Sequence, residues 1–364
     1  MFTPADHDFM ARALELAAQG LATTTPNPRV GAVIVREGRV VGEGWHRRAG
    51  EPHAELLALA QAGGQARGAT VYLTLEPCSH FGRTPPCVDA LIDARVGRVV
   101  AAMEDPNPRV NGRGLERLRA AGVDVRCGLL EQEARELNVG FVSRMSRELP
   151  WVRMKVAASL DGGTALRNGR SQWITGEAAR TDGHAWRSRA CAILTGIGTV
   201  RDDDPELTVR LVPATRQPLR VLVDSRLEVS LDAKLLHAGG PVLLVCAADN
   251  PDKERELRDR GCEILKLANA AGKVDLPALM RELARREINE LHVEAGARLN
   301  ASLVREGCVD ELLVYLAPSL LGDAAGMFAL PPLEDLDGRI PLVFRSADRV
   351  GDDLRIVARF AGRD

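Results

Sequence analysis

The spacing of apolar residues along the first third of the chain alternates between the periods of helices and strands. Residues 1–20 predict an amphipathic helix with one apolar face. The apolar runs Val30–Val35 and Val40–Trp45 flank Glu37-Gly38, a pattern typical of a β-hairpin. We expect the following elements next: a helix at His53–Ala62, a strand at Thr70–Leu75, a helix opened by Pro86, strands at Val96–Met103 and Val123–Cys127, and a helix from Glu131 to about Phe141. This alternation indicates an α/β domain.

A second α/β pattern fills the rest of the chain. The stretch Val142–Pro150 is polar, basic and closed by a proline, so we place the boundary there, with domains at residues 1–146 and 147–364. Strands are expected at Val152–Ala158, Ala190–Thr195, Leu219–Val223, Val242–Cys246, Glu263–Leu267, Leu291–Glu294, Leu312–Leu316 and Leu354–Phe360. Helices are expected at Glu177–Arg189, Pro251–Arg260, Leu276–Arg286 and Ala301–Glu306.

Composition narrows the class of function. The 364 residues include 48 Lys and Arg against 50 Asp and Glu, and 4% aromatic residues, which favours neither nucleic-acid binding nor a base-stacking surface. No apolar run approaches the roughly 18 residues of a membrane-spanning helix. The N-terminal segment lacks the basic start and apolar stretch of a signal peptide, and the seven cysteines show no disulfide spacing. We expect a cytoplasmic protein that binds a small molecule; a homo-oligomer stays open.

Three metal-ligand residues and one carboxylate have the pattern of a catalytic zinc site. His53 and Glu55 belong to one short run, and Cys78 and Cys87 bracket eight residues. One histidine and two cysteines can hold Zn²⁺ and leave its fourth position for water, whose pKa zinc lowers to near neutrality. Glu55 can move protons without binding metal. A structural zinc site is the alternative, but such sites usually use four protein ligands and need no carboxylate.

This pattern resembles the zinc deaminase signature, His-x-Glu followed by Pro-Cys and a second Cys. The usual spacing between the cysteines is two residues, and the longer form PCSHFGRTPPC, together with TPNPRVGAV, resembles the bifunctional deaminase–reductase family of riboflavin biosynthesis. Asn27, held between two prolines, has a donor and an acceptor with which to read a ring, although alone it could be a turn residue. The loop residues His80 and Arg83 suit an anionic ligand, and His46 is a further candidate contact; each histidine could equally be a surface or hydrogen-bonded residue.

The second domain lacks a Gly-x-Gly-x-x-Gly after a strand, so a Rossmann cofactor site is not supported. Instead VRMKVAASLDG, SQWITG, AILTGIGTVRDDDPELTVR, RVLVDS and HVEAG occur in the order of the reductase half of the same family. The resemblance implies a cytidine-deaminase-like α/β/α domain followed by a dihydrofolate-reductase-like α/β domain that uses NADPH. It implies NADPH contacts at Ala158, Trp173, Thr199, Asp203, Ser225, Gly296, Ala297, Arg298, Leu299, Asn300, Ala301 and Ser302. It implies substrate contacts at Ser171, Arg187, Leu207, Arg210 and Glu294.

Two of these arginines make physical sense as ligands of a sugar phosphate, because guanidinium binds phosphate through two hydrogen bonds. Strand alternation favours Lys155 as a further residue that faces the site. The alternatives are a solvated helix face for a single arginine and ordinary strand-end polarity for Lys155.

The resemblance implies hydrolytic deamination of 2,5-diamino-6-ribosylamino-4(3H)-pyrimidinone 5′-phosphate, followed by NADPH-dependent reduction of the ribosyl group to ribityl. Two other functions remain open on the residues alone. One is a cytosine or tRNA adenosine deaminase with an accessory domain, which the near-neutral charge and the long Cys loop disfavour. The other is a zinc-stabilised module that binds a nucleotide without catalysis.

Overall fold

A computed structural model describes residues 2–79 and 86–362. The chain divides into two compact units, Met1–Glu148 and Leu149–Asp364, and each is described by itself. The segment Val142–Pro150, in which we placed the domain boundary, is mostly helical, because helix α6 (Val139–Arg147) covers most of it and contains the 146/147 position. Phe141 and Ser143 are buried in this helix, so the segment packs as part of the first unit.

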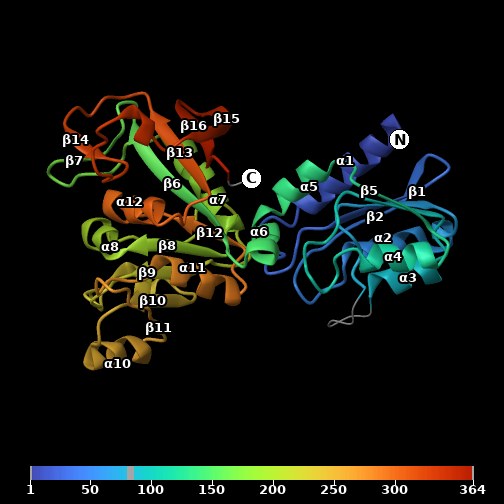
Figure 1. The fold of residues 1–364 in the computed structure, drawn as a ribbon, viewed down its shortest axis with the longest axis horizontal. Coiled ribbons are helices and arrows are strands. Elements are labelled where there is room, and N and C mark those ends of the chain that lie inside the picture. The colour runs from blue at the N-terminus through green and yellow to red at the C-terminus, as the bar shows by residue number, and fades with distance from the viewer. Residues whose placement is uncertain (1, 80–85, 363–364) are drawn as a thin grey trace. The chain divides into compact units, whose positions relative to one another are not determined.

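The first unit is built on a five-stranded mixed sheet in the order β2-β1-β3-β4-β5. Strands β1 and β2 form the expected hairpin, β1 pairs antiparallel with β3, and β3, β4 and β5 are parallel. The strands are β1 (Gly31–Arg36), β2 (Arg39–Trp45), β3 (Thr70–Leu73), β4 (Arg98–Ala101) and β5 (Asp124–Cys127). The other helices are α1 (Pro4–Ala18), α2 (Ala54–Ala62), α3 (Cys87–Asp93), α4 (Arg113–Ala120) and α5 (Glu131–Leu137), with a 3₁₀ turn at Gly63–Ala66. Helices α1 and α5 lie on one side of this sheet, and α2, α3 and α4 lie on the other (Figure 1).

Two glycines let helices approach this sheet on opposite faces. A Cβ on Gly31 would lie 1.9 Å from the carbonyl oxygen of Ala13 in α1, and one on Gly44 would lie 2.4 Å from that of Ala54 in α2. Gly44 is paired with Ala32, the neighbour of Gly31, so the two glycines belong to opposite faces of the hairpin. The close approach of α2 fixes where its N-terminus, with His53 and Glu55, meets the sheet.

The second unit contains a nine-stranded sheet in the order β11-β10-β9-β8-β12-β6-β13-β16-β15. The strands from β11 to β13 are parallel, whereas β16 and β15 are antiparallel to their neighbours. They are β6 (Trp151–Ser159), β8 (Ala192–Gly196), β9 (Leu219–Val223), β10 (Val242–Cys246), β11 (Glu263–Lys266), β12 (Glu290–Val293), β13 (Glu311–Ala317), β15 (Leu342–Val350) and β16 (Asp353–Phe360). Strands β7 (Gly163–Leu166) and β14 (Ala324–Gly326) form a separate ribbon.

Within the described residues of this unit, up to residue 362, six helices accompany the sheet. They are α7 (Glu177–Arg189), α8 (Ile197–Asp203), α9 (Lys234–His237), α10 (Pro251–Asp259), α11 (Leu276–Arg285) and α12 (Ala297–Arg305), with a 3₁₀ turn at Leu336–Gly338. The strands expected in this unit are confirmed as β6, β8, β9, β10, β11, β12, β13 and β16, whereas β7 and β14 were not expected. The expected start of a helix at Ala301 is wrong, because α12 begins four residues earlier, directly after the N-cap Gly296. The edge strand β15 was not expected, since its residues lack a clear alternation and are almost all exposed.

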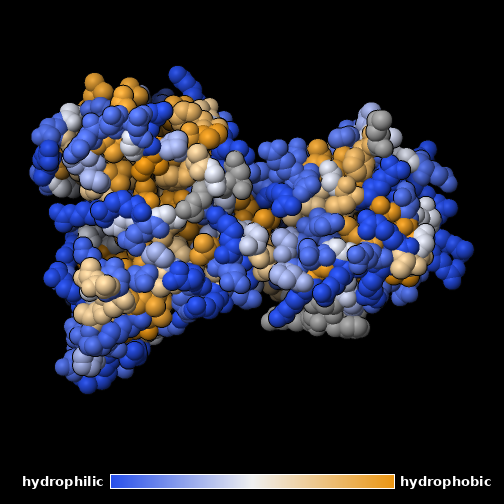
Figure 2. Space-filling view, viewed as in Figure 1, coloured by the Kyte–Doolittle hydropathy of each residue, from blue (hydrophilic) through white to orange (hydrophobic). Residues whose placement is uncertain are grey.

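Hydrophilic residues cover most of the visible surface of both units, with apolar residues interspersed (Figure 2). Several of the most exposed large apolar side chains follow β13, among them Leu320, Leu336 and Phe344. No helix in the described parts of the chain has the length and apolar character to cross a membrane.

Candidate active sites

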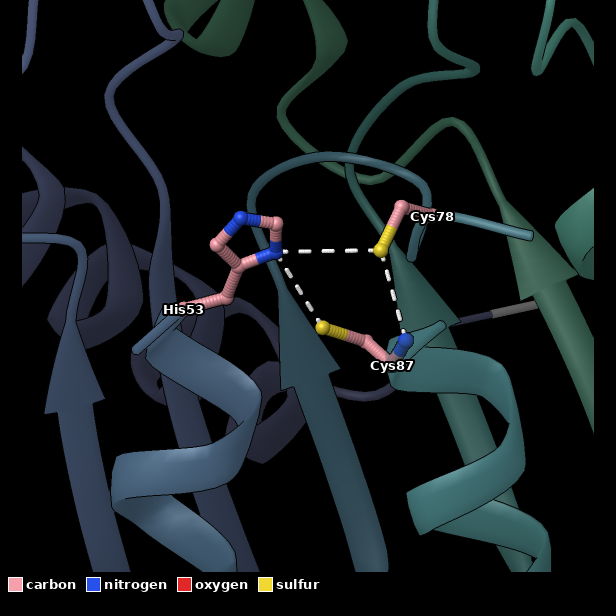
Figure 3. A group of neighbouring side chains, drawn as sticks. All are labelled: His53, Cys78 and Cys87. Atoms are coloured by element: carbon pink, nitrogen blue, oxygen red, sulfur yellow. Dashed lines mark hydrogen bonds between the residues drawn. The ribbon is translucent and has the colours of Figure 1, made fainter. Parts of the chain in front are cut away.

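The sulfur atoms of two cysteines and a histidine nitrogen converge in the first unit (Figure 3). The Nδ1 atom of His53 lies 3.7 Å from Sγ of Cys78 and 3.3 Å from Sγ of Cys87. All three candidate ligand atoms lie within 4.8 Å of one another. Two thiolates and an imidazole are the donors that zinc prefers in proteins, so the chemistry and spacing of this group fit Zn²⁺.

Three local structures bring these ligands together. His53 is the N-cap of α2, one position before the helical turn that carries Glu55. Cys78 follows the carboxyl end of β3, and Cys87 is the first residue of α3, after the N-cap Pro86. The backbone N–H of Cys87 donates to Sγ of Cys78 at 3.3 Å. The helix start thus supplies a fixed donor to the sulfur, as helix N-termini favour thiolates.

The charges of the two cysteines explain why a cation belongs between them. Hydrogen bonds from the Cys87 side chain and from His53 lower the pKa of Cys78 to about 4. The hydrogen bond to Cys78 and burial raise the pKa of Cys87, because a second anionic sulfur would lie beside the first. A bound metal ion removes that repulsion and lets both sulfurs act as thiolate ligands.

Glu55 lies beside the ligands with a free carboxylate oxygen. Its side chain is 3% exposed, and its Oε2 atom has no hydrogen-bond partner among the described residues. Burial raises the pKa of Glu55, while the nearby His53 opposes that shift. A buried, unpartnered carboxylate oxygen is costly unless a ligand or reacting group occupies the adjacent space. This position suits a group that exchanges protons with bound water and substrate.

Two further predicted residues form a line of contacts toward His53. Nδ2 of Asn27 lies 3.0 Å from Nε2 of His46, and Nδ1 of His46 lies 3.3 Å from the carbonyl oxygen of Pro52. The His46 and His53 rings meet edge to face with centroids 5.1 Å apart. A carbonyl next to Nδ1 places the His46 proton there, so Nε2 accepts from the Asn27 amide. The Asn27 carbonyl oxygen is thereby turned away from His46.

Glu76 is a buried residue near the site that sequence reasoning missed. Its carboxylate accepts backbone N–H groups of Asp105, Gly112 and Gly114 at 2.8–3.0 Å. These bonds attach the N-terminus of α4 to the segment that carries Cys78. The signal was present in the sequence as Gly112-Arg113-Gly114, because a Cβ on Gly114 would lie 2.2 Å from the carbonyl oxygen of Pro77. The predicted contacts His80 and Arg83 lie outside the described residues.

In the second unit, an ion pair joins α7 to the end of β12. Arg187 donates from Nε and Nη2 to the two carboxylate oxygens of Glu294, at 2.5 and 2.8 Å. Burial opposes ionisation of Glu294, but Arg187 and Lys155 hold its pKa well below the usual range. Burial lowers the pKa of Lys155. Three of the predicted substrate contacts therefore form one charged group.

The remaining predicted substrate contacts lie in two loops. Leu207 has a positive φ of 53° and a buried side chain, while the Arg210 side chain is about half exposed and Nη1 lies 3.7 Å from Glu206. Nη1 of Arg187 also donates to the Thr208 carbonyl oxygen at 2.9 Å, so the loop containing Leu207 and Arg210 is attached to α7. In the other loop, the Ser171 hydroxyl donates to Asp203 at 2.6 Å, joining a predicted substrate contact to a predicted NADPH contact.

The predicted NADPH contacts follow the carboxyl ends of parallel strands β6, β8, β9 and β12, the edge at which open α/β sheets bind ligands. Thr199 and Gly296 are neighbours, since a Cβ on Gly296 would lie 3.7 Å from Oγ1 of Thr199. Trp173 is 68% exposed, with the Arg180 guanidinium 4.6 Å from its ring centroid. Two other side chains of this group form hydrogen bonds within the protein. The Ser225 hydroxyl accepts from the N–H of Val274, and the Ser302 hydroxyl donates to the Arg298 carbonyl oxygen.

Asn300 is the member of this group that points most clearly to a missing partner. Its side chain is buried, and its Nδ2 donates to the Met327 carbonyl oxygen at 3.2 Å. Its Oδ1 has no partner among the described residues. Backbone N–H groups at the start of α12, next to the N-cap Gly296, could hold phosphate oxygens. The residues present therefore fit a phosphate-bearing cofactor such as NADPH.

Comparison with known proteins assigns both units. Residues 3–103 match the family model of the cytidine and deoxycytidylate deaminase zinc-binding region, and residues 150–355 match that of the RibD C-terminal domain. The fold and the site thus define a zinc deaminase joined to a reductase. The riboflavin biosynthesis protein RibD of Escherichia coli is 48% identical, with 96% of this chain and 98% of that protein covered. The corresponding Aquifex aeolicus protein is 42% identical, with coverage of 98% and 99%. The chain belongs to the RibD family.

Solved structures agree with this assignment. RibD of Acinetobacter baumannii gives a TM-score of 0.90 at 42% identity, covering 98% of this chain and 99% of that one. A Thermotoga maritima protein described as a diaminohydroxyphosphoribosylaminopyrimidine deaminase and 5-amino-6-(5-phosphoribosylamino)uracil reductase gives 0.87 at 32% identity, with the same coverage. The expected two-part fold, a deaminase and a reductase, and the expected zinc and NADPH are confirmed by these relationships.

Proposed function

We propose that this bifunctional deaminase and reductase of riboflavin biosynthesis acts on a diamino-pyrimidinone ribosyl phosphate, with one reaction in each unit. The observation that carries the proposal is the convergence of His53, Cys78 and Cys87 beside the unpartnered carboxylate of Glu55. That arrangement stands in a chain whose second unit matches the reductase domain of the same family. The first unit would replace a ring amino group by oxygen, and the second would reduce the ribosyl group.

In the deaminase site, His53, Cys78 and Cys87 would hold zinc. When bound there, zinc supplies a Lewis acid that makes water a nucleophile at neutral pH. Glu55 would accept a proton from the attacking water, pass it to the ring nitrogen and assist the departure of ammonia. Asn27, whose amide nitrogen is held by His46, would present its carbonyl oxygen to a ring N–H or amino group. His46, His80 and Arg83 remain proposed substrate contacts.

In the reductase site, NADPH supplies the hydride. Its proposed contacts are those given above, at the carboxyl ends of the parallel strands. Lys155, whose pKa is lowered by burial, would give a proton to the sugar oxygen that becomes basic on reduction. Glu294 would contact the substrate in a fixed orientation, because Arg187 donates to both of its carboxylate oxygens. Arg187 and Arg210, with Ser171 and Leu207, would contact the phosphate-bearing end.

The near-equal numbers of basic and acidic residues support a small-molecule substrate rather than a nucleic acid. The free cysteines, two of which would have to stay reduced to bind zinc, support a cytoplasmic location. A homo-oligomer is the remaining partner of the chain to be tested, by measuring its mass in solution. We propose that the boundary between the deaminase and reductase domains lies near residue 146, close to the end of the first compact unit at Glu148.

The test of the metal assignment uses Cys78→Ser and Cys87→Ser. Each variant should lose bound zinc, measured by metal analysis of the purified protein, together with ammonia release from the diamino substrate. Cys246→Ser is a matched control, since this buried cysteine belongs to β10 of the other unit. Full zinc occupancy in both site variants would overturn the ligand assignment.

A further inference from the structure

A buried histidine on α7 has no role in the site as described so far. His184 lies one turn before Arg187 in α7 and is 6% exposed. Its Nδ1 atom accepts the backbone N–H of Arg210 at 3.1 Å. It therefore connects the helix that carries Arg187 to the loop that carries Arg210.

The hydrogen bond at Nδ1 determines where the imidazole proton resides. Two donors approach the ring, the backbone N–H of Arg210 at Nδ1 (3.1 Å) and Nη1 of Arg187 at Nε2 (3.4 Å), and a neutral ring can accept from only one of them. The shorter contact assigns the lone pair to Nδ1 and the proton to Nε2. Burial and the cationic Arg187 and Arg210 lower the pKa of His184 to about 4, which agrees with a neutral ring. The Nε2 atom is thus a hydrogen-bond donor.

This donor has no acceptor in the described parts of the chain. Nε2 of His184 lies 3.4 Å from Nη1 of Arg187, but an arginine nitrogen carries only donors, so the two N–H groups face each other without a hydrogen bond. Nη1 of Arg187 already donates to the Thr208 carbonyl oxygen. A pair of adjacent donors, one of them on a buried ring, is satisfied by an anion that accepts from both.

Phosphate oxygens are acceptors of this kind, and the reductase site has two candidate sources, the substrate and the NADPH phosphates. Arg210 lies in the loop that His184 holds, and its guanidinium is about half exposed, with Nη1 3.4 Å from the Thr208 hydroxyl. Arg187, Arg210 and His184 are thus three donors on two connected segments. The predicted NADPH contacts instead follow β8, β9 and β12, with Thr199 next to Gly296.

We propose that His184 is a substrate-binding residue of the reductase, donating from Nε2 to an oxygen of the substrate's phosphate monoester. The proposal rests on the proposed function in that it takes Arg187 and Arg210 as neighbours of that phosphate. His184 thus has two roles: Nδ1 accepts the backbone N–H of Arg210 and fixes that loop, and Nε2 donates to the phosphate.

Two substitutions separate these duties. In His184→Asn the side-chain oxygen can take the place of Nδ1 and accept from Arg210, but nothing reaches the position of Nε2. In His184→Gln the longer amide reaches the position of Nε2 and can donate there, but the acceptor for Arg210 is lost. Both are measured by NADPH oxidation with the deaminated pyrimidine ribosyl phosphate and with its dephosphorylated analogue. Ammonia release by the first unit in the same samples reports the amount of intact protein.

The expected result is a rise of about tenfold or more in KM for the phosphorylated substrate in His184→Asn, as for a lost hydrogen bond to a charged group. KM for the dephosphorylated analogue and for NADPH should stay near wild type, and His184→Gln should retain more phosphate discrimination than His184→Asn. Wild-type discrimination in His184→Asn, an equal loss with both substrates, or a loss confined to the KM for NADPH would each overturn the role of His184.

Failure of the underlying assignment gives a different result. If the wild-type protein itself reduces both substrates with the same KM, no phosphate contact operates at Arg187 or Arg210 either, and that part of the proposed function fails together with the role of His184. If the wild type discriminates and His184→Asn discriminates equally well, the role of His184 fails alone.

Discussion

Arg187 donates to both carboxylate oxygens of Glu294, from Nε to Oε1 at 2.5 Å and from Nη2 to Oε2 at 2.8 Å. Both side chains are largely buried, and two parallel charge-assisted bonds fix the plane of the carboxylate. The sequence suggested Arg187 as a clamp for the sugar phosphate. In the structure two of its three guanidinium nitrogens donate hydrogen bonds to Glu294. The main role of Arg187 is therefore to keep that carboxylate ionised and in a fixed orientation.

We therefore predict that Arg187→Lys lowers kcat of the reductase more than it raises KM. Lysine keeps the positive charge but cannot donate from two fixed nitrogens to one carboxylate. A loss of about 1.5–3 kcal/mol, as for a charge-assisted bond, corresponds to roughly a ten- to hundredfold drop in rate. Steady-state NADPH oxidation by the deaminated substrate measures it, with Arg167→Lys in an exposed pair as the control. An unchanged kcat would contradict the positioning role.

Glu55→Gln should separate proton transfer from metal binding. The amide preserves the shape of the buried side chain but cannot accept a proton, so deamination should fall by about 10²–10⁴-fold. Zinc content should remain near that of the wild type, because Glu55 is not among the three ligand atoms that converge. Ammonia release and metal analysis on one preparation test the loss of deamination and the retention of zinc. An undiminished rate of ammonia release would rule out the proton-transfer role.

A buried charge network near the start of β6 should contribute to the stability of the second unit. Arg153 is 3% exposed and donates to Glu311 at 2.5 Å and Glu290 at 3.0 Å. Arg153→Ala removes this cation from two buried carboxylates, although Glu290 keeps Arg189 and Glu311 keeps Arg359 as a partner. The free energy of unfolding should therefore fall by at most about 3–5 kcal/mol. Arg167→Ala, in a pair with side chains 71% and 81% exposed, should change it by no more than about 1 kcal/mol. Denaturant unfolding measures both changes in free energy. Equally small changes for the two variants would contradict the predicted contribution of the Arg153 network.

The low pKa of His184 predicts a specific dependence of stability on pH. Its folded-state pKa, about 4, lies below the ordinary value of 6.5, because burial and two arginines disfavour the charged ring. The unfolded chain then takes up the proton first, so stability is lost as pH falls from about 6.5 toward 4. The contribution is at most roughly 3 kcal/mol.

His184→Asn should remove this contribution, since asparagine does not titrate. The difference in unfolding free energy between wild type and variant should change between pH 7 and pH 4 and be constant above about pH 7. Urea unfolding at a series of pH values provides the measurement. Parallel stability curves for the two proteins across that range would show that His184 is not held neutral by its surroundings.

The sequence predicted the parts of this molecule that depend on local pattern and on chemistry. The Glu37-Gly38 hairpin, the strands β9 and β10 and the helix α7 follow from spacing alone. The ligands His53, Cys78 and Cys87 could be predicted because one histidine and two cysteines near a glutamate are typical of a catalytic zinc site. Their convergence at helix N-termini could be expected because α2 and α3 begin beside them.

Features that depend on contacts distant in sequence were missed. The carboxylate of Glu76 bonds backbone groups about 30 to 40 residues away, and the acidic residue itself carries no mark of that. The ion pair of Arg187 with Glu294 was missed because the two residues lie 107 positions apart in the chain. The edge strand β15 has neither an apolar face nor buried residues, so no periodicity revealed it. Helix α6 was missed, because its residues were interpreted only as a polar, basic segment at the domain boundary.

The central claim is that zinc chemistry in the first unit and hydride transfer in the second are separate reactions of one chain. It is tested most directly by following NADPH oxidation in zinc-stripped and zinc-reconstituted protein, with the diamino substrate and with the already deaminated one. The account predicts that stripped protein releases no ammonia and oxidises no NADPH with the diamino substrate, yet reduces the deaminated substrate at the full rate, and that zinc restores the coupled reaction. NADPH oxidation with the diamino substrate in the absence of zinc, or loss of reduction of the deaminated substrate on stripping, would contradict it.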